Sequence, residues 1–318
     1  MELCITSLPN LAYRSRGRLS LAILTHAWAN SEETAKETVI ARYLSLMPLL
    51  MTYFPEGEFC PVTAPSEFAD LEVPVKPLHA LAVQRRLESI SLSNPLPRHT
   101  VGLMTTAAAE NQGRWIRHCF PWTPSFDDWS RLLDMLIHQL ESMKVTIRLQ
   151  KTQLGEIQRH DMENTIRQCE KFLTSGESYQ LILKRQVEML RDVTLEQRLA
   201  LELAAFKVGV FITAPCPIDH ALGGVVGQSI TGHGPAGRKK NDYCGGFDLV
   251  DIPVSAAGQP EWFPEKAAFC ANEAAAAFRL PSPPLEDRPG ITLRRSRTGF
   301  AMMPWRMTEE KSSIAMFR

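Results

Sequence analysis

The residues best suited to bind a phosphate lie in one glycine-rich, basic stretch, 231–240. Its candidate phosphate-binding residues are Gly232, Gly234, Gly237 and Lys239. The glycines match G-x-G-x-x-G and half-match a P-loop, which holds phosphates with backbone amides, a lysine and a hydroxyl. However, Arg238 stands where the lysine belongs, and Lys239 stands where the hydroxyl belongs. A predicted helix also precedes the stretch, where both nucleotide-binding motifs need a strand. We therefore interpret it as a surface loop, with a phosphate site as the weaker alternative.

The cysteines and histidines are the other groups with nucleophilic or metal-binding chemistry. The seven cysteines are widely spaced and never form a C-x-x-C pair, so the sequence indicates neither a disulfide framework nor a zinc site. His118 and Cys119 are neighbours on a predicted strand and point to opposite faces, so they cannot pair with each other. We expect Asp219 to cap a helix. The signatures of common hydrolases, zincins and deaminases are absent from the sequence. We expect no catalytic residue, metal site or cofactor, and an enzyme using His118 and Cys216 is an alternative.

Basic side chains near the C-terminus are candidates for contact with nucleic acid phosphates. Together with the glycine-rich loop, the candidates are Lys239, Lys240, Arg294, Arg295 and Arg297. The chain as a whole carries 35 basic and 35 acidic residues, and a sequence-independent grip on nucleic acid needs a basic excess. We therefore favour a solvated strand face or a contact to an acidic neighbouring domain, and a nucleic-acid adaptor is the third alternative.

The composition is that of a globular protein. Of 318 residues, 44% are hydrophobic and 22% are charged, which excludes wholesale disorder, a collagen-like repeat and a small disulfide scaffold. A chain of this length can bury a large core in roughly two domains. The N-terminus does not look like a signal peptide, and the longest apolar run, 43–55, is too short to span a bilayer and is broken by Pro48. We expect a cytoplasmic protein without a membrane span.

Hydrophobic periodicity predicts an α+β fold, with two mixed layers of helices on sheets and with strand-helix-strand units. Helices are expected near 31–50, 79–89, 125–140, 154–172, 178–191, 194–206, 218–230 and 264–280. Strands are expected near 114–122, 143–149, 206–213, 247–254 and 291–297. The predicted helix N-caps include Ser31, Ser125 and Thr194. After Thr194, helical spacing predicts a buried stripe of Leu195, Leu199, Leu203 and Phe206.

We expect three consecutive segments along the chain. Residues 1–100 form an N-terminal α/β segment with a proline-rich loop. Residues 101–215 hold a central strand-helix-strand unit with further helices. Residues 216–318 form a C-terminal α/β segment, with a linker at 281–290 that contains four prolines.

Several short motifs resemble those of a known family. They are Ala276-Ala277-Phe278-Arg279-Leu280-Pro281 with the prolines that follow, Phe120-Pro121, Val145-Thr146-Ile147-Arg148-Leu149, 205–211, and the opening Leu8-Pro9-Asn10. In this order they resemble the N-terminal, non-motor region of bacterial HerA/FtsK-type hexameric ATPases. The resemblance spans most of the chain, although each motif is short.

The resemblance implies a mixed α/β platform that is followed, in such proteins, by a RecA-like motor with Walker A and B motifs. The motor translocates DNA or protein. This chain ends at Arg318, where the motor would begin, so we expect no RecA-like core and no catalytic residue carried over from the family. The expected function is a non-catalytic N-terminal platform or assembly module. It would form a homo-oligomer, a hexamer in the full assembly, and act with an ATPase motor through which DNA is reached.

Overall fold

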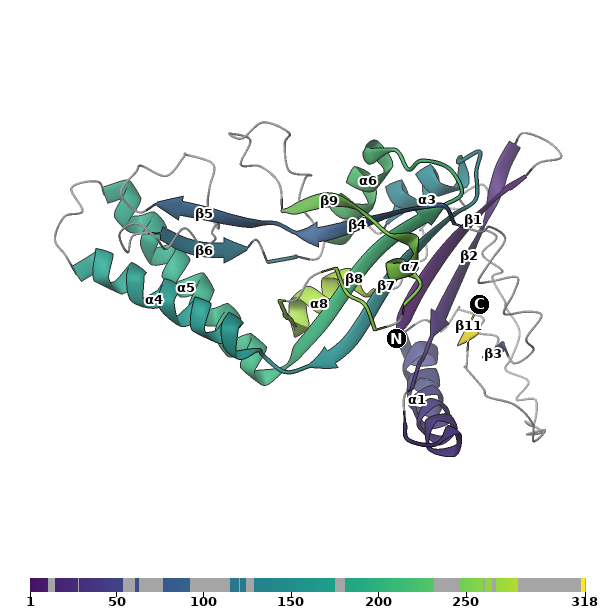
Figure 1. The fold of residues 1–318 in the computed structure, drawn as a ribbon, viewed down its shortest axis with the longest axis horizontal. Coiled ribbons are helices and arrows are strands. Elements are labelled where there is room, and N and C mark those ends of the chain that lie inside the picture. Colours follow the sequence, from purple (N-terminus) through teal and green to yellow (C-terminus); the bar gives the residue numbers. More distant parts are fainter. Residues whose placement is uncertain are drawn as a thin grey trace. The chain divides into compact units, whose positions relative to one another are not determined.

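The computed structural model describes residues 1–10, 15–27, 29–53, 61–62, 77–91, 115–119, 121–123, 129–174, 181–231, 246–259, 261–264, 267–279 and 316–317. The fold is α+β, as expected (Figure 1). The chain divides into two compact units. Unit 1 comprises Met1–Lys76, Leu133–Thr146 and Pro283–Arg318, and unit 2 comprises Pro77–Leu132 and Ile147–Ser282. These units differ from the three consecutive segments expected above, because strand pairing joins stretches that are far apart in the sequence.

The sheet of unit 1 is built on a hairpin of β1 (Glu2–Asn10) and β2 (Ser15–Leu24). The two strands are antiparallel, with Glu2 opposite Leu24 and Ser7 opposite Leu19. Strand β1 neighbours β7 (Met143–Thr152), whose first four residues belong to unit 1. The Cys4 Sγ lies 3.9 Å from the Thr146 Oγ1 in the core of this unit.

The chain's last strand completes the other side of this sheet. Strand β11 (Met316–Phe317) lies between β2 and β3 (Pro61–Val62), and it is antiparallel to both. The C-terminal residues therefore return to a sheet that the N-terminal residues begin (Figure 1).

Helix α1 (Glu32–Tyr53) begins where its N-cap was predicted. The Ser31 Oγ accepts a hydrogen bond from the Thr34 backbone N–H at 3.2 Å, so the prediction of this cap is confirmed. Val39 and Tyr43 are buried, whereas the next residue, Leu44, is 60% exposed.

The sheet of unit 2 has β4 (His79–Arg85) near its centre, between β8 (Ala205–Ala214) and β9 (Phe247–Ile252). Strand β4 is antiparallel to both neighbours, and Leu81 lies opposite Ile212 on one side and Asp251 on the other. The remaining part of β7 lies beside β8, and the short β10 (Phe269–Cys270) also pairs with β8.

The helix expected at 79–89 is therefore wrong: the segment forms β4 and β5 (Leu87–Ser91). Leu81, Ala82 and Val83 are all buried, so both faces of β4 are covered. A strand covered on both faces has a continuous apolar run, which periodicity alone cannot distinguish from a helix.

The expected strand, helix and strand are present as β6 (Trp115–Cys119), α3 (Ser130–Ile137) and β7. However, β6 pairs with β5 in a separate two-stranded sheet, so the three elements are not a crossover within one sheet. Trp129 was expected inside the helix, but its φ of 65° places it in the left-handed region just before α3. The predicted cap Ser125 lies outside the described residues.

Helices α4 (Glu156–Thr174) and α5 (Leu181–Leu203) lie side by side, and α4 also contacts β6 (Figure 1). The expected break before Thr194 is wrong. Thr194 lies inside α5, where its hydroxyl donates to the Leu190 carbonyl oxygen at 2.7 Å. The hydroxyl thus has a local backbone partner within the helix and does not need to cap a helix end.

The expected buried stripe on α5 is wrong as well. Leu195, Leu199 and Leu203 are 42%, 53% and 88% exposed. Among the side chains of α5 that the structure describes, the buried ones are Val187, Leu190, Thr194, Gln197 and Leu201. The buried residues are spaced three or four positions apart, and two of them are polar. A prediction from hydrophobicity alone therefore chose the wrong face of the helix.

Three helices complete unit 2: α6 (His220–Thr231), α7 (Val254–Ala257) and α8 (Ala271–Ala277). The helix expected at 264–280 is reduced to α8, because Phe269 and Cys270 join the sheet as β10. None of the described helices combines the length and the hydropathy that crossing a bilayer requires.

Candidate functional site

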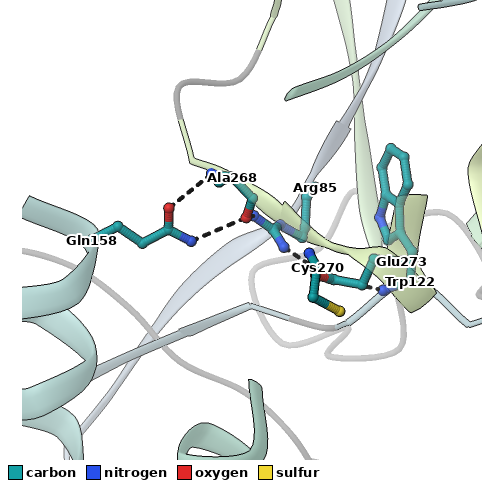
Figure 2. Close-up of polar contacts among 6 residues, drawn as sticks. All are labelled: Arg85, Trp122, Gln158, Ala268, Cys270 and Glu273. Atoms are coloured by element: carbon teal, nitrogen blue, oxygen red, sulfur yellow. Dashed lines mark hydrogen bonds and ion pairs between the residues drawn. The ribbon is translucent and has the colours of Figure 1, made fainter. Parts of the chain in front are cut away.

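A buried ion pair joins Arg85, at the end of β4, to Glu273, in the first turn of α8 (Figure 2). The Arg85 Nη1 lies 2.8 Å from the Glu273 Oε1, and the two side chains are 0% and 1% exposed. A charge removed from water is costly unless it is paired and hydrogen-bonded, so each of these groups requires the other.

The position of Glu273 follows from the start of α8. Cys270 is the N-cap of this helix, and its thiol accepts a hydrogen bond from the backbone N–H of Glu273. In return, the Glu273 Oε2 accepts the Cys270 backbone N–H at 2.9 Å. This is a capping box in which a cysteine replaces the usual serine or threonine.

Further contacts surround the pair. The Glu273 Oε1 also accepts the Trp122 backbone N–H at 3.3 Å. The Arg85 Nη2 donates to the Ala268 carbonyl oxygen at 3.1 Å, and the guanidinium lies 4.0 Å from the centroid of the Phe269 ring. Such a contact between a cation and an aromatic face adds to the ion pair. The Trp122 and Phe269 rings pack with centroids 4.8 Å apart.

Gln158 connects α4 to the same network (Figure 2). Its side-chain amide donates to the Ala268 carbonyl oxygen at 3.1 Å and accepts the Ala268 backbone N–H at 2.8 Å. A strand neighbour would satisfy the Ala268 backbone in the same way. We define the buried lock as Arg85, Trp122, Gln158, Ala268, Cys270 and Glu273.

The buried lock is suited to holding elements in place rather than to catalysis. Both oxygens of Glu273 accept hydrogen bonds, one of them from the guanidinium of Arg85. A general base must reach a proton on a substrate, and this carboxylate is buried and surrounded by protein donors. The lock joins β4, β10, α4, α8 and the segment at Trp122 within unit 2.

A second buried arginine has a related role. The guanidinium of Arg148, on β7, donates to the carbonyl oxygens of Gln259, Trp262 and Ala257 at 2.6, 2.9 and 3.0 Å. It also lies 4.9 Å from the centroid of the Phe211 ring. The fork of one guanidinium thus fixes the turn that follows α7, a task for which lysine lacks the geometry.

Two buried thiols of unit 2, those of Cys169 and Cys270, are poorly suited to nucleophilic chemistry. Burial raises the pKa of the Cys169 thiol to about 12. Burial, followed by the nearby charge of Glu273, also raises the pKa of Cys270. A protonated thiol is a poor nucleophile and a poor metal ligand, so neither residue is suited to the expected alternative of a cysteine enzyme. Cys216 lies just beyond β8 and is partly exposed, and the side chain of His118 lies outside the described residues.

Within the part of the chain that the structure describes, no three His, Cys, Asp or Glu side chains gather to hold a metal ion. Asp219 acts as a cap: its Oδ1 accepts the Ala221 backbone N–H at 2.9 Å where α6 begins, so this prediction is confirmed.

The phosphate and nucleic-acid candidates fall outside the described residues. They are Gly232, Gly234, Gly237, Lys239, Lys240, Arg294, Arg295 and Arg297. Thr231, the buried last residue of α6, directly precedes Gly232 in the sequence. Arg279 donates to the Ser229 carbonyl oxygen of the same helix at 2.9 Å.

Sequence reasoning missed Arg85, Glu273 and Arg148. In the sequence, Arg148 and Thr146 alternate with apolar residues, a pattern typical of a strand with one solvent-facing side, yet both are buried. For Glu273, the signal was its place three residues after a helix cap, and the cap was not recognised because cysteine is an unusual N-cap.

Comparisons with family models, with curated proteins and with solved structures found no match to this chain.

Proposed function

We propose that this chain is a non-catalytic assembly module of an ATP-driven translocase, acting in the cytoplasm beside an ATPase motor. Copies of the chain associate through an exposed leucine stripe and form a platform for the motor. The resemblance to HerA/FtsK-type ATPases is the ground for proposing the motor and its cargo, DNA or protein. The ground for proposing self-assembly is the exposed surface of the chain itself.

The observation that supports the proposal most strongly is the α5 stripe, defined as Leu195, Leu199 and Leu203. These leucines are spaced four residues apart, so they follow one another along one side of the helix. They are 42%, 53% and 88% exposed, while the opposite face of α5 is buried. Scattered exposed leucines are ordinary, but consecutive leucines at helical spacing form the kind of ridge that packs against another helix.

The fixed framework under the stripe also supports an assembly role. Helix α5 is joined to α4 by an ion pair between the Arg198 Nη2 and the Glu163 Oε1 at 2.9 Å. Helix α4 is in turn attached to the buried lock through Gln158. A recognition surface held on rigid elements loses less conformational entropy when it binds.

The oligomeric state of the full chain tests the proposal. We expect light scattering after size-exclusion chromatography to give an oligomer for the wild-type protein and a monomer for the Leu199→Gln/Leu203→Gln variant. The matched control is Leu140→Gln, because Leu140 is 80% exposed but lies outside the stripe. Exposed substitutions usually change the free energy of unfolding by less than about 0.5 kcal/mol, so urea unfolding should be similar for all three proteins.

Two results would contradict the proposal. A wild-type protein that stays monomeric at micromolar concentrations would exclude self-assembly, and a stripe variant that remains oligomeric would exclude the stripe. Hydrolysis of Mg-ATP by the purified chain at the rate of a motor would contradict its non-catalytic role.

A further inference from the structure

The C-terminal strand β11 pairs with the side of β2 that faces away from β1. Met316 lies opposite Leu24, and Phe317 lies opposite Ile23. We infer that this strand is exchanged between copies of the chain, so that β11 of one copy pairs with β2 of another. The inference rests on the self-assembly proposed above and names a second contact through which it occurs.

The edge that β11 covers needs an occupant. On its other side β2 pairs with β1, and Leu24 is opposite Glu2 there. Ile23 and Leu24 are both 3% exposed. Without β11, the backbone donors and acceptors on this side of these residues would form an open, apolar strand edge. Such edges readily accept a strand from another chain, and proteins generally cover them.

The occupant is short and far along the chain from its partner. Strand β11 contributes only two residues, which pair with β2 on one side and with β3 on the other. Between Arg279, the last described residue of unit 2, and Met316 lie 36 residues, Leu280 to Ala315. A chain of that length can span at most about 130 Å when fully extended, which is enough to reach a neighbouring copy.

Chain connectivity gives the native pairing little advantage over exchange. The entropy of closing a loop grows slowly, by about 0.6 kcal/mol for each doubling of loop length. In an assembled oligomer, association makes pairing with the β11 of a neighbour an effectively intramolecular event, which raises its effective concentration. Exchange of identical elements then forms the same backbone pairs and adds a link between subunits.

Disulfide trapping between separately tagged copies tests the inference. Cα atoms directly opposite each other in an antiparallel pair are about 4.5–5.5 Å apart, which suits a disulfide. A tagged Leu24→Cys chain is mixed with an untagged Met316→Cys chain, dissociated in mild urea, reassembled and oxidised. We expect a covalent dimer of tagged and untagged chains, in excess over either variant oxidised alone. The control pairs Met316→Cys with Leu21→Cys, since Leu21 is three residues out of register, and it should give no such dimer.

The Leu24→Cys/Met316→Cys double variant separates the possible outcomes. If it forms only a disulfide within one chain, while the mixture of oligomeric single variants gives no covalent dimer, exchange is excluded and self-assembly stands. If the double variant forms no disulfide at all, β11 does not hold this register, and the inference fails as well. If light scattering shows that the chains are monomeric, the proposed assembly itself fails, and exchange fails with it.

Discussion

The Arg85 Nη1 lies 2.8 Å from the Glu273 Oε1, although the two residues are 188 positions apart in the sequence. One ends a central strand of the unit 2 sheet, and the other stands in the first turn of α8. Both are buried, so the pair joins two distant parts of the chain through a contact from which water is excluded. The arrangement of unit 2 thus depends on a polar contact inside an otherwise apolar core.

Removing one partner of this pair should be far more harmful than removing both. Glu273→Gln leaves the guanidinium of Arg85 buried without its counter-charge, which typically costs about 3–5 kcal/mol. The Arg85→Met/Glu273→Gln double variant no longer carries the unpaired charge, and it should recover part of the loss. The measurement is the free energy of unfolding in urea for both single variants and the double variant.

The double-mutant cycle gives a clear criterion. A coupling energy near zero between positions 85 and 273 would show that the two side chains act independently, contrary to the structure. Lys36→Gln is a suitable control, because Lys36 pairs with Glu32 on the surface of α1. Exposed pairs contribute only about 0–1 kcal/mol.

Much of the fold follows from periodicity in the sequence. Strands β7, β8 and β9 alternate or run apolar as expected, and α6 begins at its predicted acidic cap. The failures concern segments for which tertiary contacts outweigh the local pattern. Strand β4 is buried on both faces, with α6 and α7 in contact with it. Helix α5 buries polar Thr194 and Gln197 while it exposes leucines.

The candidate site was less predictable than the fold. The partner of Arg85 is distant in the sequence, and nothing in the local sequence around Arg85 indicates a buried charge. Arg148 lies in a strand whose alternation of polar and apolar residues is typical of a solvent-facing side, yet it binds three backbone carbonyls. A buried arginine is stabilised by partners that only the three-dimensional fold supplies.

A close contact between α6 and β9 predicts a steric effect at Gly227. A Cβ atom at this position would overlap the ring of Phe247, which is fully buried. Gly227→Ala should therefore destabilise the protein by about 1–3 kcal/mol, as overpacking does in other cores. Adding Phe247→Leu should restore part of that loss by making room for the methyl group.

Gly155→Ala is the matched control, because a Cβ at Gly155 has nothing within 4 Å. Gly155 directly precedes α4, and its carbonyl oxygen accepts the Arg159 backbone N–H, so alanine loses only the preference for glycine at a helix N-cap and should cost less than at Gly227, about 0.5–1 kcal/mol. Equal losses for Gly227→Ala and Gly155→Ala would argue against close packing at Phe247.

The turn after α7 should loosen when Arg148 is replaced. Arg148→Lys keeps the positive charge but not the planar fork that reaches the carbonyls of Ala257, Gln259 and Trp262. Hydrogen–deuterium exchange should become faster in peptides covering residues 253–264, with little change in α4. Unchanged protection of that segment would show that Arg148 does not fix the turn.

The free energy of unfolding should depend on pH in the alkaline range because of Cys169. Its folded pKa is raised to about 12 from an ordinary value of 9.0, chiefly because the thiol is buried among Val187, Leu190 and neighbouring side chains. The folded state therefore keeps its proton at a pH where the unfolded chain loses it. Stability from this group is fully present below pH 9.0 and falls as the pH rises from there toward 12. The limiting slope is about 1.4 kcal/mol per pH unit.

Cys169→Ala removes the titrating thiol, so its unfolding free energy should decline less steeply than that of the wild type between pH 9 and pH 11. The free energy of unfolding of the variant is lower at neutral pH because the smaller side chain leaves a cavity, and only the difference in slope reports on the thiol.

Iodoacetamide supplies a second measurement. At pH 8 it should modify the partly exposed Cys216 well before Cys169, since the buried thiol is protonated and shielded. Identical slopes of unfolding free energy against pH in the two proteins, together with rapid alkylation of Cys169 in the folded state, would mean that this thiol is not buried and that its pKa is not raised.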